Sequence, residues 1–410
     1  MSWTRRGVLA SVAGGCAISG CLNSSNNAGR ALPTIPAGTW SQSGCDAQNT
    51  SASDVTVPRR GTPAWSGGSG LLTPVVVDGM VYTVDDVLTA LDAQTGEQRW
   101  QKNLGIEQSP NSATQPAVAG NHLLIASNSR LRSFNTADGS KQWDRNITGS
   151  PDQPITVAPD QQRGFVFFRR PEQGGISSAL FGFGIESGEI EWTSPLRDLD
   201  YPPAVIGNHV YAAGWDDPKT QVLRCLELDG GELVWEREIE NQKTPPIGTD
   251  AGVLIGDGAK ITIYNSSNGE QLTSVSTPNG QIRAIAINDG TAYVLSESGL
   301  SAVSVPDGNE QWSRSGESDY AQSDGLAVGR ETVVAPVFPE FPETSPAIAA
   351  FDRTDGTPRW HYTIDESFSP TIVSPPVLAD GAVFAMSNTK TGVTALGDLP
   401  PQEEESSSSS

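Results

Sequence analysis

Residues 90–100 read ALDAQTGEQRW: a short apolar run, a polar turn that contains Gly96 and, four residues later, Trp100. The arrangement recurs along the chain, with copies 38 to 49 residues apart. Repeat periods near 40–50 residues are typical of propeller blades. The turn glycines are Gly96, Gly139, Gly188, Gly231, Gly269, Gly308 and Gly356, and the copies end at Trp100, Trp143, Trp192, Trp235, Thr273 in a degenerate copy, Trp312 and Trp360.

Each copy follows a stretch that predicts three further strands. In the first unit this stretch is residues 73–92, TPVVVDGMVYTVDDVLTALD, whose apolar runs are separated by turns such as Asp78-Gly79. An Asp-Gly pair between apolar runs is a strong hairpin signal. Related stretches occupy residues 115–134, 202–215 and 374–396. Each unit is therefore expected to form four antiparallel strands, the last of which carries the Trp.

The repeats predict a closed ring, because one blade cannot bury both of its faces alone. Each Trp is expected to pack on the turn of a neighbouring blade, where the Gly leaves room. The last unit, 374–396, is followed by no Trp, whereas Trp65 has no strands before it. We therefore predict that the strand around Trp65 completes the last blade. The fold class is an all-β, eight-bladed propeller of four-stranded blades; the degenerate copy at Thr273 leaves seven blades as the alternative.

The first twenty residues resemble an export signal. Arg5 and Arg6 form a twin-arginine pair, and residues 7–20 are small or apolar and uncharged. That run is too short for a stable membrane-spanning helix. Residues 18–21 read ISGC, which resembles a lipobox and implies cleavage before Cys21 and a lipid on its sulfur. Cys16 is a weaker candidate, and a plain secretory signal is the alternative.

The chain is expected to divide into four parts. These are a signal peptide (1–20), a lipid-anchored tether and lead-in (21–60), the propeller (61–397) and a disordered acidic and Ser-rich tail (398–410). The expected location is the outer face of the cytoplasmic membrane. We expect a monomer.

The charge is strongly acidic, with 48 Asp and Glu against 26 Lys and Arg and a formal net charge of −22. Such a surface repels nucleic acids and anionic lipid head groups, so nucleic-acid binding is excluded. The acidic residues are spread along the chain, which is typical of a surface adapted to high salt. A functional acidic patch for a cationic partner is the alternative.

The repeat ALDAQTGEQRW resembles the tryptophan-docking repeat of the PQQ-type quinoprotein propellers, and the resemblance covers residues 61–397. Residues 39–53, TWSQSGCDAQNTSAS, resemble the lead-in of exported propellers of halophilic archaea. Within this superfamily the chain is similar to lipid-anchored, non-enzymatic propellers, including the lipoprotein of the bacterial outer-membrane barrel-assembly machine. The enzymes of the family bind pyrroloquinoline quinone (PQQ) and Ca²⁺, which the resemblance implies as an alternative.

No catalytic residue or metal site is predicted. The vicinal Cys pair of many quinoprotein dehydrogenases is absent from the sequence, and the state of Cys45 and Cys225 stays open. His122 and His209 occupy the same turn of two different units, which favours a structural role, and His361 follows a docking Trp. There is no Ser-His-Asp ordering and no phosphate-binding loop.

Three long loops are expected on one face of the ring, at residues 169–178, 214–220 and 336–347. Aromatic residues beside polar groups suit a protein interface, whereas tolerated surface insertions are the alternative. The candidate partner-binding residues are Trp215, Asp216, Asp217, Phe338, Glu340, Phe341 and Glu343.

These features predict a non-catalytic scaffold that binds another envelope or membrane protein, whose identity the sequence does not give. The first alternative is a PQQ- and Ca²⁺-dependent alcohol or sugar dehydrogenase. The second is a carbohydrate-binding surface protein.

The charge also generates a prediction about stability. We expect the fold to lose thermal stability in dilute salt, because salt screens repulsion among the surface carboxylates. Thermal unfolding measured in ~0.1 M and ~3 M KCl tests this. Equal unfolding temperatures in the two solutions would contradict it.

Overall fold

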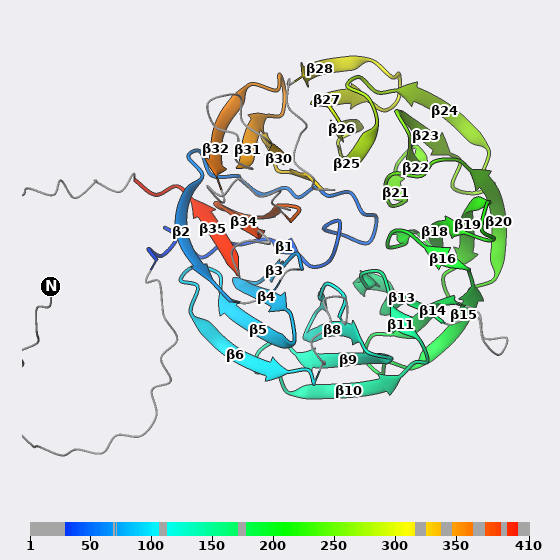
Figure 1. Ribbon diagram of the computed structural model, residues 1–410, viewed down its shortest axis with the longest axis horizontal. Coiled ribbons are helices and arrows are strands. Elements are labelled where there is room, and N and C mark those ends of the chain that lie inside the picture. Colours follow the sequence, from blue (N-terminus) through cyan, green and yellow to red (C-terminus); the bar gives the residue numbers. More distant parts are fainter. Residues whose placement is uncertain are drawn as a thin grey trace, which may run out of the picture.

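Eight small antiparallel sheets are arranged in a ring around a common axis (Figure 1). This is a computed structural model, and it describes residues 29–68, 70, 72–105, 113–170, 178–315, 325–337, 347–363, 374–386 and 392–400. In each blade the first strand lies nearest the axis and the fourth forms the rim. The prediction of an all-β, eight-bladed propeller is confirmed.

Blades 1 to 4 follow one another along the first half of the chain. Blade 1 contains β1 (Thr39–Trp40), β3 (Val75–Val77), β4 (Met80–Val84), β5 (Val87–Asp92) and β6 (Gln98–Asn103). Blade 2 contains β7 (Ala117–Ala119), β8 (His122–Ser127), β9 (Arg130–Asn135) and β10 (Lys141–Asn146). Blade 3 contains β11 (Ser150–Pro151), β12 (Thr156–Ala158), the 3₁₀ helix η1 (Pro159–Gln161), β13 (Arg163–Arg169), β14 (Ala179–Gly184) and β15 (Ile190–Pro195). Blade 4 contains β16 (Asp198–Leu199), β17 (Ala204–Ile206), β18 (His209–Trp215), β19 (Gln221–Glu227) and β20 (Leu233–Ile239).

Blades 5 to 8 complete the ring. Blade 5 contains β21 (Ile247–Thr249), β22 (Gly252–Asp257), β23 (Lys260–Tyr264) and β24 (Gln271–Ser276). Blade 6 contains β25 (Ile282–Asn288), β26 (Thr291–Ser296), β27 (Gly299–Ser304) and β28 (Glu310–Ser315). Blade 7 contains β29 (Ala327–Val328), β30 (Thr332–Val337), β31 (Ala347–Asp352) and β32 (Pro358–Thr363). Blade 8 contains β33 (Val377–Ala379), β34 (Ala382–Met386), β35 (Val393–Gly397) and β2 (Thr62–Gly67).

Blade 8 is closed by a strand from the other end of the chain. Strand β2 pairs antiparallel with β35, and Trp65 lies opposite Ala395. The last repeat unit, which has no Trp of its own, and the strand that carries Trp65 therefore form one sheet. Blade 5, which carries Thr273 in place of the Trp, still has four strands, so the seven-bladed alternative is wrong.

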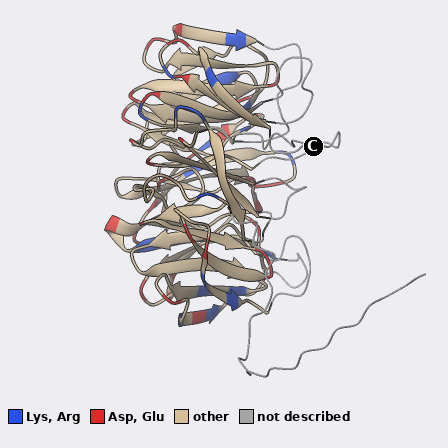
Figure 2. Cartoon of the chain, turned by 90° about the vertical axis from the view of Figure 1, so that its left-hand side faces the viewer, with Lys and Arg blue, Asp and Glu red and all other residues tan. Residues whose placement is uncertain are grey.

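The burial of the strands follows their position in a blade. The second and third strands, such as β8 and β27, are buried almost throughout, because neighbouring blades cover both of their faces. The fourth strands, such as β6 and β24, alternate between more and less exposed residues, because they form the rim. In Figure 2 the acidic residues lie mainly in the turns that connect the strands.

Neighbouring blades are joined by the docking Trp residues. A Cβ atom added to a turn glycine would lie within 2.7 Å of the indole from the preceding blade, as at Gly96, Gly139, Gly188 and Gly231. Each indole also donates a hydrogen bond to the turn on which it lies. Trp65, Trp100, Trp143, Trp192, Trp235, Trp312 and Trp360 donate to the carbonyl oxygens of Ala93, Thr136, Ile185, Leu228, Ser266, Arg353 and Pro58, over 2.6 to 3.2 Å.

Two details of this junction differ from the simple repeat. In blade 5 the Trp is missing, and Val275 instead lies 3.1 Å from the position that a Cβ atom of Gly308 would take. Elsewhere an arginine two residues after the Trp reaches the same turn, as when Arg237 Nε donates to the Gly269 oxygen over 3.0 Å. The repeat in the sequence predicted the Trp and Gly positions, but it did not predict the contact of the arginine with the turn.

The junction predicts different costs for two glycine substitutions. Gly231 and Gly207 both have positive φ angles, 69° and 58°, so Ala costs about 1–2 kcal/mol at either site. Only at Gly231 would the new methyl group meet an indole, that of Trp192, which adds about 1–3 kcal/mol. We therefore expect denaturant to unfold Gly231→Ala well before Gly207→Ala. Equal unfolding midpoints would show that the indole has room to move.

Candidate functional site

The axis of the ring is occupied by part of the chain that precedes the first blade. We call described residues 29–60 the lead-in segment; Figure 1 shows it running from the edge of the ring into the middle and back. From the sequence, residues 21–60 were expected to form one tether and lead-in. Within it, β1 pairs with β3 of blade 1, with Trp40 opposite Val76.

The lead-in segment bonds to the innermost strand or first turn of every blade. Inner strands are sheet edges, whose free N–H groups need partners. The N–H groups of Val118, Val205, Gly248, Ile287, Val328 and Gly381 donate to the carbonyl oxygens of Ser41, Ala47, Gln48, Thr50, Ser51 and Thr56, over 2.7 to 2.9 Å. In blade 3 the side chain of Gln42 makes the contact. Its Oε1 accepts a hydrogen bond from Val157 N over 2.6 Å, and its Nε2 donates to the Val157 carbonyl oxygen over 3.0 Å. Eight separate sheets are thus tied to one strand of chain.

A tight turn at residues 44–50 shapes the segment at the axis. The Asp46 carboxylate accepts hydrogen bonds from the backbone N–H groups of Gln48, over 2.9 Å, and Thr50, over 3.1 Å. Asn49 is 1% exposed, and its Nδ2 donates to the carbonyl oxygens of Pro202, Pro203 and Pro246, over 3.1 to 3.3 Å. The Asp and Asn of the lead-in motif therefore fold the turn and attach it to blades 4 and 5.

A cavity of about 120 Å³ lies beside this turn, where the inner strands of several blades begin. Its lining combines the lead-in segment with residues that precede or begin inner strands. The described lining residues are Trp40, Ser43, Gly44, Asn49, Ser51, Thr73, Gln115, Tyr201, Pro202, Pro245, Arg283, Ala284, Ile285, Gly325, Leu326 and Pro375. None of them is Asp or Glu, although the chain contains 48 acidic residues.

The two faces of the ring differ in what they present. The turn face carries the connections between first and second strands and between third and fourth strands. The loop face carries the connections between second and third strands and the links between blades. Because β3 begins opposite the end of β4, residues at the start of inner strands lie towards the loop face. The cavity is therefore on the loop-face side of the axis.

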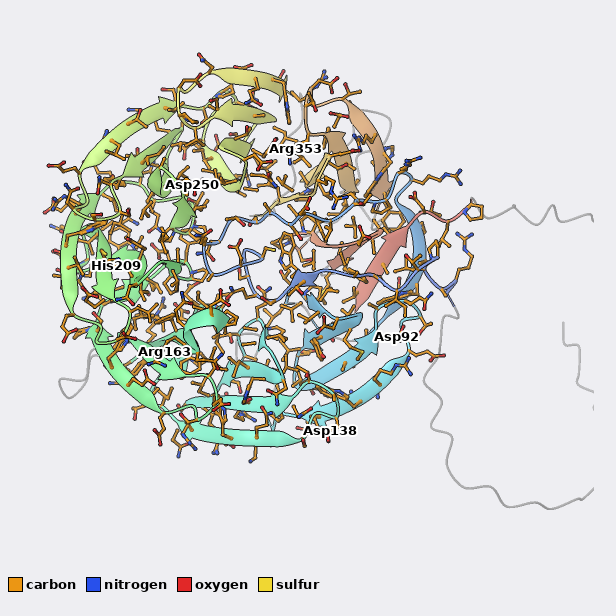
Figure 3. The ribbon with its side chains drawn as sticks, turned by 180° about the vertical axis from the view of Figure 1, so that it is seen from behind. Asp92, Asp138, Arg163, His209, Asp250 and Arg353 are labelled. Atoms are coloured by element: carbon orange, nitrogen blue, oxygen red, sulfur yellow. The ribbon has the colours of Figure 1, made fainter. Side chains whose placement is uncertain are left out.

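Several charged groups on the turn face form ion pairs with one another. Figure 3 labels Asp92, Arg163 and Arg353 among residues distributed around the ring. Arg99 contacts Asp92 over 2.6 Å, Arg163 contacts Glu191 over 2.7 Å, and Arg353 contacts Asp289 of the preceding blade over 2.9 Å. These pairs fasten turns, and we assign them a structural role.

Three predicted partner-binding residues lie together on the loop face of blade 4. Trp215 ends β18, is half-buried, and donates from its indole nitrogen to Asp200 over 2.8 Å. Asp216 pairs with Arg224. Asp217 accepts from the N–H groups of Lys219 and Thr220, and the Lys219 bond is the largest cause that lowers its pKa. Both carboxylates thus have partners within the protein. Of the three side chains, that of half-buried Trp215 has exposed surface left for a partner.

Several other predicted residues fall outside the described part of the chain. These are Arg5, Arg6, Cys21, Phe338, Glu340, Phe341 and Glu343. Among the described residues, no helix is long and apolar enough to cross a membrane.

The described cysteines and two of the histidines occupy positions within the sheets and the lead-in segment. Cys45 and Cys225 are both free and buried, and burial raises the pKa of each thiol, that of Cys225 to about 11. His122 and His209 each begin the second strand of a blade, as their shared turn position indicated, and His209 is labelled in Figure 3. His122 Nδ1 lies 3.0 Å from Ser133 Oγ, and burial lowers its pKa.

The Ca²⁺ and quinone of the resembling enzymes would need suitable ligands among the residues around the axis. Ca²⁺ takes six to eight oxygen ligands, usually including carboxylates. The described lining of the cavity offers no carboxylate, and no group of three or more His, Cys, Asp or Glu suited to a metal occurs in the described ranges. The described lining does not fit a Ca²⁺-assisted quinone site.

Comparison with protein families gives a match over residues 50–218 and 218–408 to the family described as outer membrane protein assembly factor BamB. Outer membrane protein assembly factor BamB of Yersinia pestis is 26% identical over 203 residues, which cover 46% of this chain and 49% of that protein. The chain thus spans about half the length of this relative.

Solved structures share the fold at low sequence identity. BamB from Moraxella catarrhalis has a TM-score of 0.61 at 14% identity, covering 83% of this chain and 98% of that one. Quinohemoprotein alcohol dehydrogenase from Comamonas testosteroni has a TM-score of 0.66 at 13% identity, covering 89% and 82%. An assembly factor and an enzyme therefore share this architecture, so function must come from the site.

The attachment of the lead-in segment at Asn49 generates a prediction. Asn49→Asp keeps the shape of the side chain but replaces a donor that serves three carbonyl oxygens. A buried group left without partners costs about 1–3 kcal/mol, and more when it is charged. We expect the variant to unfold at clearly lower denaturant concentration at neutral pH.

Asn241→Asp is the matched control, because Asn241 also has a positive φ, 50°, but is exposed. It should unfold close to the parent protein. Equal unfolding midpoints of the two variants would show that the Asn49 amide does not stabilise the attachment of the lead-in segment to blades 4 and 5.

Proposed function

We propose a function from one premise: the chain belongs to the family described as outer membrane protein assembly factor BamB, whose model matches most of its length. We infer a non-catalytic scaffold of the cell envelope that binds another envelope or membrane protein. In this proposal the propeller is exported through the twin-arginine signal and anchored by a lipid on Cys21. Its place is the outer face of the cytoplasmic membrane of a halophilic archaeon.

The observation that carries the proposal is the occupied axis. The lead-in segment uses N–H groups of the inner strands in one blade after another. A large cofactor or a peptide strand has no edge to pair with there. Contact with a macromolecular partner is therefore left to the two faces and the rim.

The path of the lead-in segment supports a choice between the two faces. Its first described residues lie on the turn face at the rim, where Arg30 N donates to Ala64 O and Leu32 N donates to Gln94 O, both over 2.8 Å. Gly29 lies eight positions after Cys21, and extended chain spans at most about 28 Å over eight residue-to-residue steps. A lipid on Cys21 would hold the turn face near the membrane and direct the loop face outwards.

The loop face of blade 4 offers a surface for a partner. Trp215 is held by its bond to Asp200, so its ring is presented in a fixed orientation. Rigid aromatic side chains are common among residues that dominate binding energy. Lys219 is exposed in the same loop. Its bond to Asp217 is made by its backbone N–H, so replacing the side chain leaves that bond in place.

Site-specific photo-crosslinking in the native cells tests the proposal. We expect a crosslinker at Lys219 to trap one envelope or membrane protein that also copurifies with the full chain. The matched control is a crosslinker at Asp250, which is exposed in a turn of the adjacent blade on the turn face (Figure 3). No adduct from Lys219, or the same adduct from Asp250, would contradict the assignment of the loop face.

The role of Trp215 is measured with the trapped protein once it is purified. We expect Trp215→Ala to weaken its binding by roughly 30-fold, the effect of a residue worth about 2 kcal/mol. Leu272→Ala is the control, because Leu272 is 51% exposed but lies on the rim in β24. Equal affinities of the two variants would remove Trp215 from the interface.

A further inference from the structure

Two residues that line the cavity at the axis, Gln115 and Arg283, each have a side-chain donor without a hydrogen-bond partner among the described residues. Gln115 is 8% exposed, and its Nε2 has no partner among the described residues. Arg283 is half-buried, and its Nε is also without a partner there. Buried donors are nearly always paired, so two polar side chains with an unpaired donor beside one small cavity direct attention to it as a ligand site.

Arg283 is brought to the cavity by a local change in blade 6. The innermost strand of that blade, β25, has seven residues, whereas the other innermost strands have two or three. Its pairing with β26 shifts register between Ile282 and Ala284, so Arg283 lies at a bulge. Bulges occur next to functional sites because they re-aim a side chain.

Gln115 reaches the same cavity from the other side of the ring. It lies two residues before β7 of blade 2, and blades 2 and 6 face each other across the axis in Figure 1. A guanidinium and an amide N–H from opposite blades therefore line one cavity. No described lining residue carries a negative charge that would neutralise Arg283.

The rest of the lining limits what the ligand can be. Apolar side chains form one part of the cavity wall, namely those of Trp40, Ile285, Leu326 and three prolines. At about 120 Å³ the cavity is smaller than the ~300–1,000 Å³ of sites for drug-sized ligands. An anionic head with a short aliphatic chain matches both the donors and the wall.

We propose that this cavity binds a small aliphatic monocarboxylate anion. The carboxylate accepts hydrogen bonds from Arg283 and Gln115, and the short chain packs on Trp40, Ile285 and Leu326. A charge-assisted bond to Arg is strong and suits the planar carboxylate. The site is separate from the loop-face surface at Trp215, and its ligand would also stabilise the contact between the lead-in segment and blade 6.

Calorimetric titration of the full chain with propionate tests the proposal, in a constant molar concentration of KCl. We expect saturable binding of one propionate per chain and a rise of the thermal unfolding temperature with propionate concentration. Propionamide has nearly the same shape without the charge, and it should bind much more weakly. Absence of saturable propionate binding, or equal binding of propionamide, would overturn the proposal.

Two variants assign the binding to the cavity. We expect Arg283→Gln to weaken propionate binding by at least about 10-fold, because a charged partner is lost. Gln115→Met, which keeps the length of the side chain, should weaken it as well and serves if the first variant folds poorly. Arg99→Gln removes the same charge from the exposed turn face and should bind propionate like the parent. Parent-like affinity in a folded Arg283→Gln or Gln115→Met variant would overturn the assignment.

Discussion

The ring depends on one junction, repeated between blades: an indole lies on a glycine of the next blade and donates its N–H to the same turn. The two halves of the contact need each other. A side chain at the glycine would occupy the place of the ring, and a smaller residue in place of the Trp would leave the turn oxygen without its donor. Blade 5 shows what remains when the indole is absent, since Val275 covers Gly308 but supplies no hydrogen bond. Its four strands still form because its neighbours on both sides are held in place.

A ring built in this way creates a second requirement at its centre. Every blade points the free edge of its innermost strand at the axis, and those N–H groups need acceptors. The lead-in segment supplies them in sequence as it passes round the channel, from Thr39 to Thr56. The junctions join each blade to its neighbours only, whereas the segment touches all eight. The lead-in segment therefore links blades that are not neighbours in the ring, which the junctions alone do not do.

The sequence was sufficient for the fold because the junction has a side-chain signature. Gly and Trp four residues apart, recurring every 38 to 49 residues, identified the blades and also showed that Trp65 must close the last one. The filling of the axis had no such signature, since it is made mostly of backbone hydrogen bonds. The motif around Asp46 and Asn49 was noticed as a lead-in, but its three proline carbonyl partners lie more than 150 residues away.

The candidate site was harder to predict for the same reason. Loop length and composition drew attention to Trp215, Asp216 and Asp217, but composition does not show which carboxylates are already paired. Arg283 carries the opposite lesson. In a chain with almost twice as many acidic as basic residues, some arginines are held by carboxylates, as Arg99, Arg163, Arg169 and Arg353 are. Others, such as Arg132 and Arg237, donate to backbone oxygens. Arg283 lies at a bulge beside a cavity whose described lining contains no acidic residue, and neither the bulge nor the cavity has a signature in the sequence. The proposed anion would supply the negative charge that the described lining of the cavity lacks.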